Sequence, residues 1–535
     1  MTPRIPLAAL AALVALCVAP SLAAAARPAA PTPSVRLPGD ASAAGVRADS
    51  GTWIVGLRPD AGAAGRRVAR AHGARPIAGT AWLVSRRRAT ALAGALRGRG
   101  LLAYAEPNRI ARRAQAPDPL SPQATWRDVV VAGQVPPPVG PTSPLIALID
   151  SAAQVDHPVF AGGNLSSQGG QGVTDFHGTA TAAVAVAAAN GVGTLGVWPG
   201  ARALNLQLPP TNILCSDSAR NIALAIQAGA AVINMSYGAQ APCLAEYEQV
   251  QAAVRAGVVP VAAAGNEFDQ GNPAEYPASL PHVVTVAATQ NDQPAFFSNQ
   301  NAAVDLSAPG SGVLTAVPAQ FDVDGTQDGF ATVEGTSFSA PMVAAAVAWV
   351  RAARPELTAD QAAGVVRLGA RDVGNPGWEP STGFGVLSMA GALTRQPSPP
   401  DPLEPNDGFS FVNGRTFKVK APPVFTGRKR AFIAETDYYE DPYDIYRLRV
   451  PGRKRIRIQL APAYGDPDLY VYNRNATSLR QGKRIVAASR RRGKRRDTVT
   501  FRNHSRRTQT FYAVVTINRR TSSLNAPYAL TMQRR

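Results

Sequence analysis

Four short stretches of the sequence carry side chains that together could cleave an acyl bond. Asp150 ends the apolar run PLIALID, His177 lies in DFHGTATAAVAVA, Asn266 ends VVPVAAAGN and Ser337 lies in GTSFSAPMV. A serine hydroxyl is a weak nucleophile until a histidine takes its proton, and a carboxylate can hold that imidazole in one tautomer. A side-chain amide can donate a hydrogen bond to the developing oxyanion. These residue types therefore supply a nucleophile, a base, an orienting carboxylate and an oxyanion donor.

Each stretch also has a plainer interpretation. Thr336 or Ser337 could simply cap a buried helix that tolerates Pro341 in its first turn. An Asp at the end of a strand is commonly a capping or turn residue, and a single His is commonly structural. The two interpretations of Ser337 are compatible, because the N–H groups and dipole at a helix N-terminus can stabilise negative charge.

The surrounding pattern predicts the sheet that would position these residues. Within residues 118–396, short apolar runs typical of buried strands alternate with helical stretches, which indicates a parallel sheet covered by helices on both faces. The strand runs are residues 144–150, 201–208, 230–238, 258–266 and 282–289. Functional residues of such sheets gather at the carboxyl ends of the strands. We therefore expect the four side chains to meet at one edge of one sheet.

In this order the motifs resemble those of the subtilisin-like serine proteases. The resemblance covers residues 118–392 and includes ALIDSAAQVDHPVF, FHGTA, VINMSYG, AAAGN, VDLSAPG and GTSFSAPMVA. It implies that Ser337 is the nucleophile, His177 the general base and Asp150 the orienting carboxylate. Asn266 and the Ser337 backbone N–H would be the oxyanion donors. It implies a serine endopeptidase that requires no cofactor; structural calcium is common in the family, but the sequence assigns no metal ligands.

The same resemblance implies a main specificity pocket built from two segments. Its lining residues would be Ser236, Tyr237, Gly238, Ala263, Ala264 and Gly265. The two glycines leave room for a substrate backbone and a large side chain. We therefore expect an apolar or aromatic side chain before the cleaved bond.

At two positions the sequence departs from the family pattern. Ala152 replaces a usual glycine, and Ala180 replaces a frequent second histidine. The methyl group of Ala152 would cost energy if its backbone needed a positive φ, but neither change removes a catalytic atom. An inactive protease-like protein that binds an envelope polymer and an esterase-like hydrolase are the alternatives. The order of the four motifs argues against the esterase.

The N-terminal part is typical of export and processing segments. Residues 1–26 have a charged start, an apolar run and small residues suited to cleavage, as in a secretory signal peptide. Residues 27–50 are expected to be a flexible leader. Residues 51–117 combine a β-α-β-β-α-β pattern with a basic connector, and they resemble the inhibitory, ferredoxin-like propeptide of the same family. We expect a secreted or cell-wall-associated protein, made as an autoinhibited precursor, with no transmembrane segment in the mature chain.

Cys215 and Cys243 are the cysteines left once the signal peptide is removed. In an exported chain they can form one disulfide, although two unrelated buried thiols are the alternative. Cys215 precedes the predicted helix 218–229, and Cys243 follows the strand run 230–238. Both cysteines should therefore lie at the same rim of the sheet, within reach of each other.

The C-terminal part begins with a Pro-rich linker at residues 397–407. Short strand-like runs without helices then predict an all-β sandwich over residues 408–535. The motifs EPND, DPYDIYRLRV and DPDLYVY resemble the pre-peptidase C-terminal domains of secreted bacterial proteases. The runs RKRIRI at 453–458 and RRRGKRR at 490–496 make this copy very basic. They are either a solvated surface or a contact for an anionic cell-wall or envelope polymer; export and the lack of a nucleic-acid motif argue against nucleic acid.

The formal net charge of +19 falls into three blocks. Residues 1–113 carry 17 Arg against 4 acidic residues, residues 114–400 carry 9 Arg against 21, and residues 401–535 carry 29 Lys and Arg against 11. A basic propeptide should therefore dock onto an acidic catalytic domain. Salt would weaken this attraction, because charges more than about 10 Å apart are largely screened at 0.1 M.

Overall fold

The computed structural model describes residues 51–108, 118–160, 163–398, 403–415, 420–437, 441–517 and 525–535. These residues form two compact units, one containing the described residues up to 108 and one containing those from 118 onward. The predicted signal peptide (1–26), the leader (27–50) and the connector at 109–117 lie outside the described residues. In the described ranges, no helix has both the length and the apolar character needed to cross a membrane.

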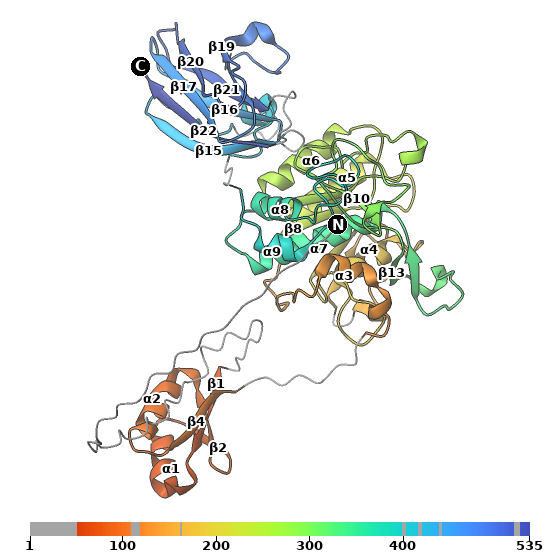
Figure 1. The fold of residues 1–535 in the computed structure, drawn as a ribbon, viewed down its shortest axis with the longest axis vertical. Helices are drawn as coiled ribbons and strands as arrows, with labels where there is room; N and C mark the ends of the chain where they lie inside the picture. The colour runs from red at the N-terminus through yellow and green to blue at the C-terminus, as the bar shows by residue number, and fades with distance from the viewer. Residues whose placement is uncertain are drawn as a thin grey trace, which may run out of the picture. The chain divides into compact units, whose positions relative to one another are not determined.

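The N-terminal unit is a four-stranded antiparallel sheet with two helices (Figure 1). Its elements are β1 (Thr52–Leu57), α1 (Gly62–Ala71), β2 (Arg75–Ala78), β3 (Ala81–Ser85), α2 (Arg86–Arg97) and β4 (Leu102–Pro107), with sheet order β2-β3-β1-β4. Helix α2 buries Ala89, Leu92, Ala93 and Leu96. This spacing places all four side chains on the face that packs onto the sheet.

The second unit contains the predicted sheet, which is parallel apart from the short edge strand β11. Its strands are β5 (Leu145–Asp150), β6 (Leu165–Gln168), β7 (Ala203–Gln207), β8 (Ala230–Met235), β9 (Val259–Ala263), β10 (Val284–Gln290), β11 (Gln293–Pro294) and β12 (Leu306–Pro309). The order is β11-β10-β9-β8-β5-β7-β6, and β12 pairs with β10. Every residue of β8 and β9 is buried, which requires cover on both faces of the sheet. The predicted α/β fold is therefore confirmed.

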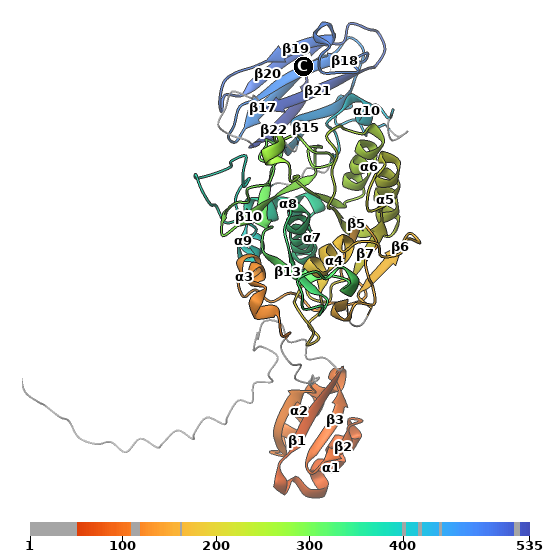
Figure 2. The ribbon, with the colours of Figure 1, turned by 90° about the vertical axis from the view of Figure 1, so that its right-hand side faces the viewer.

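Alternate side chains of β5 enter two different cores. Ile146 and Leu148 join the cluster that contains the buried residues of α4 and α7, whereas Ala147 and Ile149 join the cluster under α5 and α6. Figure 2 shows the two helix pairs on the two sides of the sheet. The helices are α3 (Thr125–Val131), α4 (His177–Val186), α5 (Cys215–Gln227), α6 (Leu244–Arg255), α7 (Thr336–Ala353), α8 (Ala359–Leu368) and α9 (Met389–Thr394).

A hairpin of β13 (Val313–Ala316) and β14 (Phe330–Val333) leads into α7. Single-turn 3₁₀ segments are also described: η1 (Pro59–Ala61), η2 (Ser121–Gln123), η3 (Pro158–Phe160), η4 (Phe268–Gln270), η5 (Ala319–Phe321) and η6 (Gly482–Arg484). Helix α7 is buried along most of its length, because its apolar and small side chains leave no polar face over residues 338–350. Its first turn contacts the carboxyl edge of the sheet, where the Gly265 N–H after β9 donates to the Thr336 hydroxyl at 3.2 Å.

Beyond α10 (Phe409–Val412), the chain forms two four-stranded antiparallel sheets. One has the order β15-β22-β17-β20 and the other β16-β21-β18-β19. The bounds are β15 (Arg430–Asp437), β16 (Tyr443–Val450), β17 (Arg455–Pro462), β18 (Pro467–Asn473), β19 (Ile485–Ser489), β20 (Asp497–Arg502), β21 (Gln509–Ile517) and β22 (Asn525–Arg534). Side chains of both sheets, such as Leu448 and Ile458, form one buried cluster. In β17, Arg455 alternates outward with the inward Ile456 and Ile458.

Candidate active site

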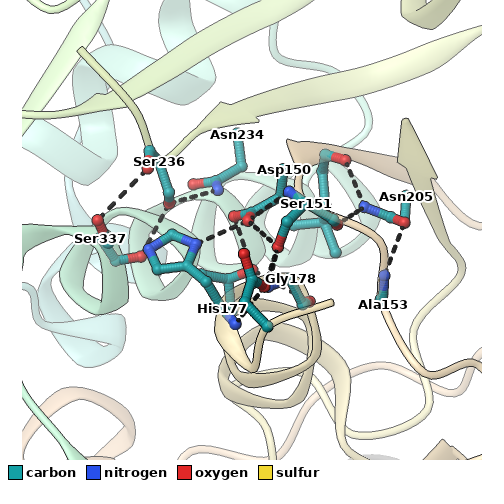
Figure 3. Close-up of polar contacts among 12 residues, drawn as sticks. Asp150, Ser151, Ala153, His177, Gly178, Asn205, Asn234, Ser236 and Ser337 are labelled. Atoms are coloured by element: carbon teal, nitrogen blue, oxygen red, sulfur yellow. Dashed lines mark hydrogen bonds and ion pairs between the residues drawn. The ribbon is translucent and has the colours of Figure 1, made fainter. Parts of the chain in front are cut away.

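Asp150, the last residue of β5, accepts hydrogen bonds through both carboxylate oxygens (Figure 3). His177 Nδ1 lies 2.7 Å from Oδ1, and the Ser151 backbone N–H donates to the same oxygen at 2.8 Å. The Thr181 hydroxyl donates to Oδ2 at 3.0 Å. The carboxylate is buried, with 4% of the residue exposed. These contacts hold it in one orientation toward the imidazole.

His177 is the first residue of α4, and its imidazole is 29% exposed. Burial lowers the pKa of His177, but the charge and hydrogen bond of Asp150 and the charge of Asp175 outweigh it, so the pKa is raised above its ordinary value. The Nδ1 contact with Asp150 leaves Nε2 as the nitrogen that can take a proton from a nucleophile. The imidazole is thus oriented and made more basic by the same partner.

Glycine at position 178 allows α4 to approach the end of β5 closely. A Cβ atom there would lie 2.1 Å from the Ser151 carbonyl oxygen. The Gly178 N–H donates to Ser151 Oγ at 3.0 Å, and that hydroxyl donates to Asp175 Oδ1 at 2.5 Å. A larger residue would push the first turn of α4, and His177 with it, away from Asp150. This contact is the physical reason for glycine after the histidine.

Ser337 lies in the first turn of α7, after Gly335 with φ of 144°. Its Oγ donates to the Ser236 carbonyl at 3.4 Å, and Ser236 Oγ donates back to the Ser337 carbonyl at 2.8 Å. The ring of the adjacent Phe338 lies 5.5 Å from the His177 ring, centroid to centroid. Figure 3 shows the His177 imidazole between Asp150 and Ser337.

No hydrogen bond joins Ser337 Oγ to His177 in the part of the chain that the structure describes. The structure therefore brings Asp150 and His177 into direct contact. Ser337 lies beside them, but its hydroxyl is hydrogen-bonded to the Ser236 carbonyl and not to the imidazole. Nucleophile–base hydrogen bonds are often long in substrate-free enzymes and shorten when substrate binds. A rotation of the Ser337 hydroxyl away from the Ser236 carbonyl would let it form a hydrogen bond with His177 Nε2.

Asn266 follows β9, and its side chain is oriented by the residue before Ser337. The Asn266 Oδ1 atom accepts from the Thr336 backbone N–H and from the Thr336 hydroxyl, each at 2.9 Å. Because two donors define the oxygen end of the amide, Nδ2 is the end left for an oxyanion. A Cβ at Gly335 would lie 3.6 Å from this Nδ2. The Ser337 N–H is one of the first four in α7, which have no intrahelical acceptor.

The predicted pocket segments follow β8 and β9, but their side chains differ in direction. Ser236 Oγ accepts from Asn234 Nδ2 at 2.9 Å. The Tyr237 hydroxyl lies 2.7 Å from Ser218 Oγ on α5, in a buried group that includes Glu246. Burial and the charge of Glu246 raise the pKa of Tyr237. The Tyr237 ring therefore packs into the core, and only its backbone can line a pocket.

The two pocket glycines lie against a carboxylate that the sequence expectation did not include. A Cβ at Gly238 would lie 2.7 Å from Glu275 Oε2, and one at Gly265 would lie 2.7 Å from Glu275 Cγ. Ala263 and Ala264 are buried next to them. A buried acidic side chain therefore borders both glycines of the predicted pocket, and the expected preference for an apolar or aromatic side chain stays a prediction. In the sequence, Glu275 is one of several acidic residues that follow Asn266, and no pattern there places its side chain next to the two glycines.

Ala152 and Ala180 are accommodated without strain. Ala152 is not among the described residues with positive φ, so its methyl group carries no backbone penalty. Ala180 is fully buried in α4, where its carbonyl accepts from the Thr315 hydroxyl at 3.2 Å. The two departures from the family pattern therefore leave the 2.7 Å contact between His177 Nδ1 and Asp150 Oδ1 in place.

The predicted disulfide between Cys215 and Cys243 is present, with the two Cα atoms 6.2 Å apart. Cys215 is the first residue of α5, and Cys243 is the N-cap of α6. Both helices start at the carboxyl rim of the sheet, as the positions in the sequence require. The bond ties the two helix starts together beside the Tyr237 segment.

A separate, largely buried cluster joins His282, before β10, to the segment that carries Glu404 and Asp407. The His282 Nε2 atom lies 3.0 Å from Asp407 Oδ2 and 3.4 Å from Glu404 Oε2. Burial lowers the pKa of His282, but the charges and hydrogen bonds of Asp407 and Glu404 raise it well above its ordinary value. With Asp441, these side chains offer ligand atoms within 4.8 Å of one another. We interpret the group as an ion-pair cluster, because His282 Nε2 contacts both carboxylates directly.

The model of the subtilase family matches residues 142–385. Subtilisin BL from Lederbergia lenta is 33% identical over 204 residues, which cover 37% of this chain and 69% of that protein. Alkaline elastase YaB from Bacillus sp. (strain YaB) is 33% identical over 228 residues, which cover 41% of this chain and 55% of the elastase.

Fervidolysin from Fervidobacterium pennivorans is 29% identical over 293 residues, which cover 47% of this chain and 41% of fervidolysin. The match thus spans less than half the length of that relative. The crystal structure of fervidolysin aligns with 87% of this chain and 92% of its own, with 16% identity and a TM-score of 0.47.

Proposed function

Because the chain belongs to the subtilase family of serine proteases, we propose that it is a secreted serine endopeptidase made as an autoinhibited precursor. The observation that carries the proposal is the 2.7 Å contact between Asp150 and His177 Nδ1, next to the helix start that bears Ser337. Its substrates are peptide bonds of proteins or peptides. The mechanism needs no cofactor, since side chains and backbone groups of the chain perform each step.

In the proposed reaction, Ser337 Oγ attacks the carbonyl carbon while His177 Nε2 takes the hydroxyl proton. Asp150 holds the imidazole in the productive tautomer and stabilises its charged form. Asn266 Nδ2 and the Ser337 N–H donate to the oxyanion of the tetrahedral intermediate. His177 then gives the proton to the leaving amine. Water, activated by His177, hydrolyses the acyl-enzyme and restores the serine.

The N-terminal unit is proposed to be the inhibitory propeptide, removed by cleavage between about residues 110 and 118. Its helix α2 begins with Arg86, Arg87 and Arg88, all exposed. These guanidinium groups suit docking onto a catalytic domain with excess carboxylates, so added salt should weaken inhibition by the isolated unit. Inhibition that is unchanged between low salt and 1 M salt would contradict the electrostatic part of this proposal.

The C-terminal sheets are proposed to act as a pre-peptidase-like β-sandwich that attaches the enzyme to an anionic cell-wall or envelope polymer. Exposure supports this role: Arg490, Arg491, Arg492, Lys494, Arg495 and Arg496 are all exposed. Six neighbouring cations on one loop can bind a polyanion through several weak contacts at once. Loss of cell-wall retention on replacing this loop by Gly and Ser, without loss of peptide hydrolysis, would be the expected result.

A fluorophosphonate label tests the proposed chemistry directly. We expect the mature protein to be labelled at Ser337, identified by peptide mass spectrometry, and to hydrolyse a denatured protein substrate. Ser337→Ala should abolish both signals, and Ser339→Ala, which changes a buried serine two residues away, should retain the label. Absence of labelling in a folded, processed protein would favour the alternative of an inactive polymer-binding protein.

A further inference from the structure

Glu275 is held beside the pocket segment by backbone pairing. Its neighbour Tyr276 exchanges two backbone hydrogen bonds with Ala239, both 2.9 Å long. Ala239 in turn follows Gly238, so the pairing places Glu275 alongside that glycine. The Glu275 carbonyl also accepts from the Ser279 N–H at 2.7 Å. The position of this side chain is therefore set by the fold and not by a free loop.

The Glu275 side chain lies against both glycines of the predicted pocket, with its carboxylate next to Gly238. Its Oε2 lies 2.7 Å from where a Cβ of Gly238 would be, and its Cγ lies 2.7 Å from where a Cβ of Gly265 would be. Glu275 is 5% exposed. A substrate side chain that entered between Gly238 and Gly265 would therefore meet this carboxylate.

A second carboxylate, Glu267, faces the same glycine. Its Oε2 would lie 2.8 Å from a Cβ of Gly265, and it accepts from the Asn266 N–H at 2.8 Å and from Asn299 Nδ2 at 3.2 Å. Glu267 is thus hydrogen-bonded, whereas no hydrogen bond or ion pair of the Glu275 carboxylate occurs among the described residues. Burial, and next the charge of Glu267, raise the pKa of Glu275 to about 7.

Building on the proposed function, we propose that Glu275 selects a lysine or arginine side chain immediately before the cleaved bond. A cationic group would give the carboxylate a charge-assisted hydrogen bond and would balance its buried charge. An aromatic or aliphatic side chain would instead bury the carboxylate without a partner, which is unfavourable. Both effects, the attraction of a basic side chain and the penalty on an apolar one, favour lysine and arginine before the cleaved bond.

The test compares peptides that differ only in the residue before the cleaved bond: Lys, Arg, Phe, Leu and Gln. The enzyme is the processed protein obtained from the full chain, measured at pH 8.5. We expect kcat/KM for Lys and Arg to exceed that for Phe and Leu by about tenfold or more, the range of one charged hydrogen bond.

Two variants connect the preference to this side chain. Glu275→Gln keeps the size and removes the charge, and should lower kcat/KM for Lys and Arg by about tenfold to a hundredfold while leaving Phe and Leu unchanged or improved. Glu275→Asp should retain part of the basic preference. The matched control is Glu356→Gln, whose side chain is 65% exposed outside the site and which should leave the preference unchanged.

The outcomes separate this inference from the proposed function. Fluorophosphonate labelling of Ser337 does not depend on the peptide sequence. A labelled enzyme that prefers Phe or Leu, or that accepts only Gly or Ala because Glu275 fills the pocket, overturns the role of Glu275 while the protease assignment stands. A folded enzyme without labelling or hydrolysis overturns the proposed function itself. If Glu275→Gln does not fold, the wild-type preference and the Glu275→Asp variant decide the question.

Discussion

The amide oxygen of Asn266 accepts two hydrogen bonds from one residue, Thr336, whose backbone N–H and hydroxyl both lie 2.9 Å away. The Thr336 hydroxyl oxygen also accepts from the Gly265 N–H at 3.2 Å. Thr336, the residue before the proposed nucleophile Ser337, therefore links the Asn266 amide, the Gly265 backbone and the start of α7. Because both donors of Thr336 are bonded to Asn266 Oδ1, its expected part in the proposed mechanism is to position Asn266.

Replacing Thr336 by valine should slow catalysis by misaligning this amide. The variant removes the hydroxyl contact and leaves the backbone one, so we expect kcat to fall about tenfold with KM nearly unchanged, less than the roughly hundredfold or greater loss expected for Asn266→Ala. Thr336→Ser should rescue most of the rate because it restores the hydroxyl. Steady-state kinetics on one peptide distinguish these cases; a rise in KM with unchanged kcat would indicate a binding role instead.

Asp150→Asn should lower kcat by about four orders of magnitude, because an amide no longer holds His177 in the productive tautomer. The pH profile supplies a second readout. The pKa of His177 is raised by Asp150, so the acid limb of kcat/KM should lie above pH 6.5 in the wild type and shift to lower pH in the variant. A variant with a reduced rate but an unmoved acid limb would show that Asp150 is not the group that makes His177 basic.

Gly178→Ala should both destabilise the protein and reduce its activity. The added Cβ would lie 2.1 Å from the Ser151 carbonyl, and such overpacking costs about 1–3 kcal/mol. Gly364→Ala is the matched control: it lies inside α8 with nothing within 4 Å of the new atom, and should be neutral or stabilise by about 0.5–1 kcal/mol. Thermal unfolding of both variants in the Ser337→Ala background avoids self-digestion. If Gly178→Ala and Gly364→Ala had the same melting temperature, the close approach of α4 to β5 would be contradicted.

The sequence was most informative where a functional residue begins or ends a regular element. Asp150 ends a run of buried residues and His177 starts a helix, so periodicity and capping patterns place both at the carboxyl edge. Glu275 lies in a loop without periodicity, and its approach to Gly238 depends on the pairing of Tyr276 with Ala239, far away in the sequence. The same limit applies to Thr336: the pattern suggests a helix cap, but its contact with Asn266 appears only once β9 and α7 are packed together.

The proposed preference for basic side chains should depend on pH in a defined direction. The pKa of Glu275 is about 7, and Glu267 is the charged group that acts on it, so the carboxyl is mainly neutral at pH 6 and ionised at pH 8.5. The ratio of kcat/KM for a Lys peptide to that for a Gln peptide should therefore rise with pH. The ionisation of His177 changes kcat/KM for both peptides by the same factor, so its effect cancels in this ratio. Glu275→Gln should give a flat ratio, and a ratio that falls with rising pH would contradict the role of Glu275.

The ion-pair cluster at His282 should make the stability of the second unit depend on pH. The pKa of His282 in the folded protein is raised well above its ordinary value, so protonated His282 stabilises the fold fully below about pH 6.5, and this contribution is lost as the pH rises through the folded-state pKa. His282→Gln should therefore lower the melting temperature of the Ser337→Ala protein strongly at pH 6 and less at high alkaline pH. His504→Gln, which changes an exposed histidine, is the control and should have little effect at either pH. If the decrease in melting temperature caused by His282→Gln became larger as the pH rises, the stabilising form would instead be neutral His282, acting as a simple hydrogen-bond partner.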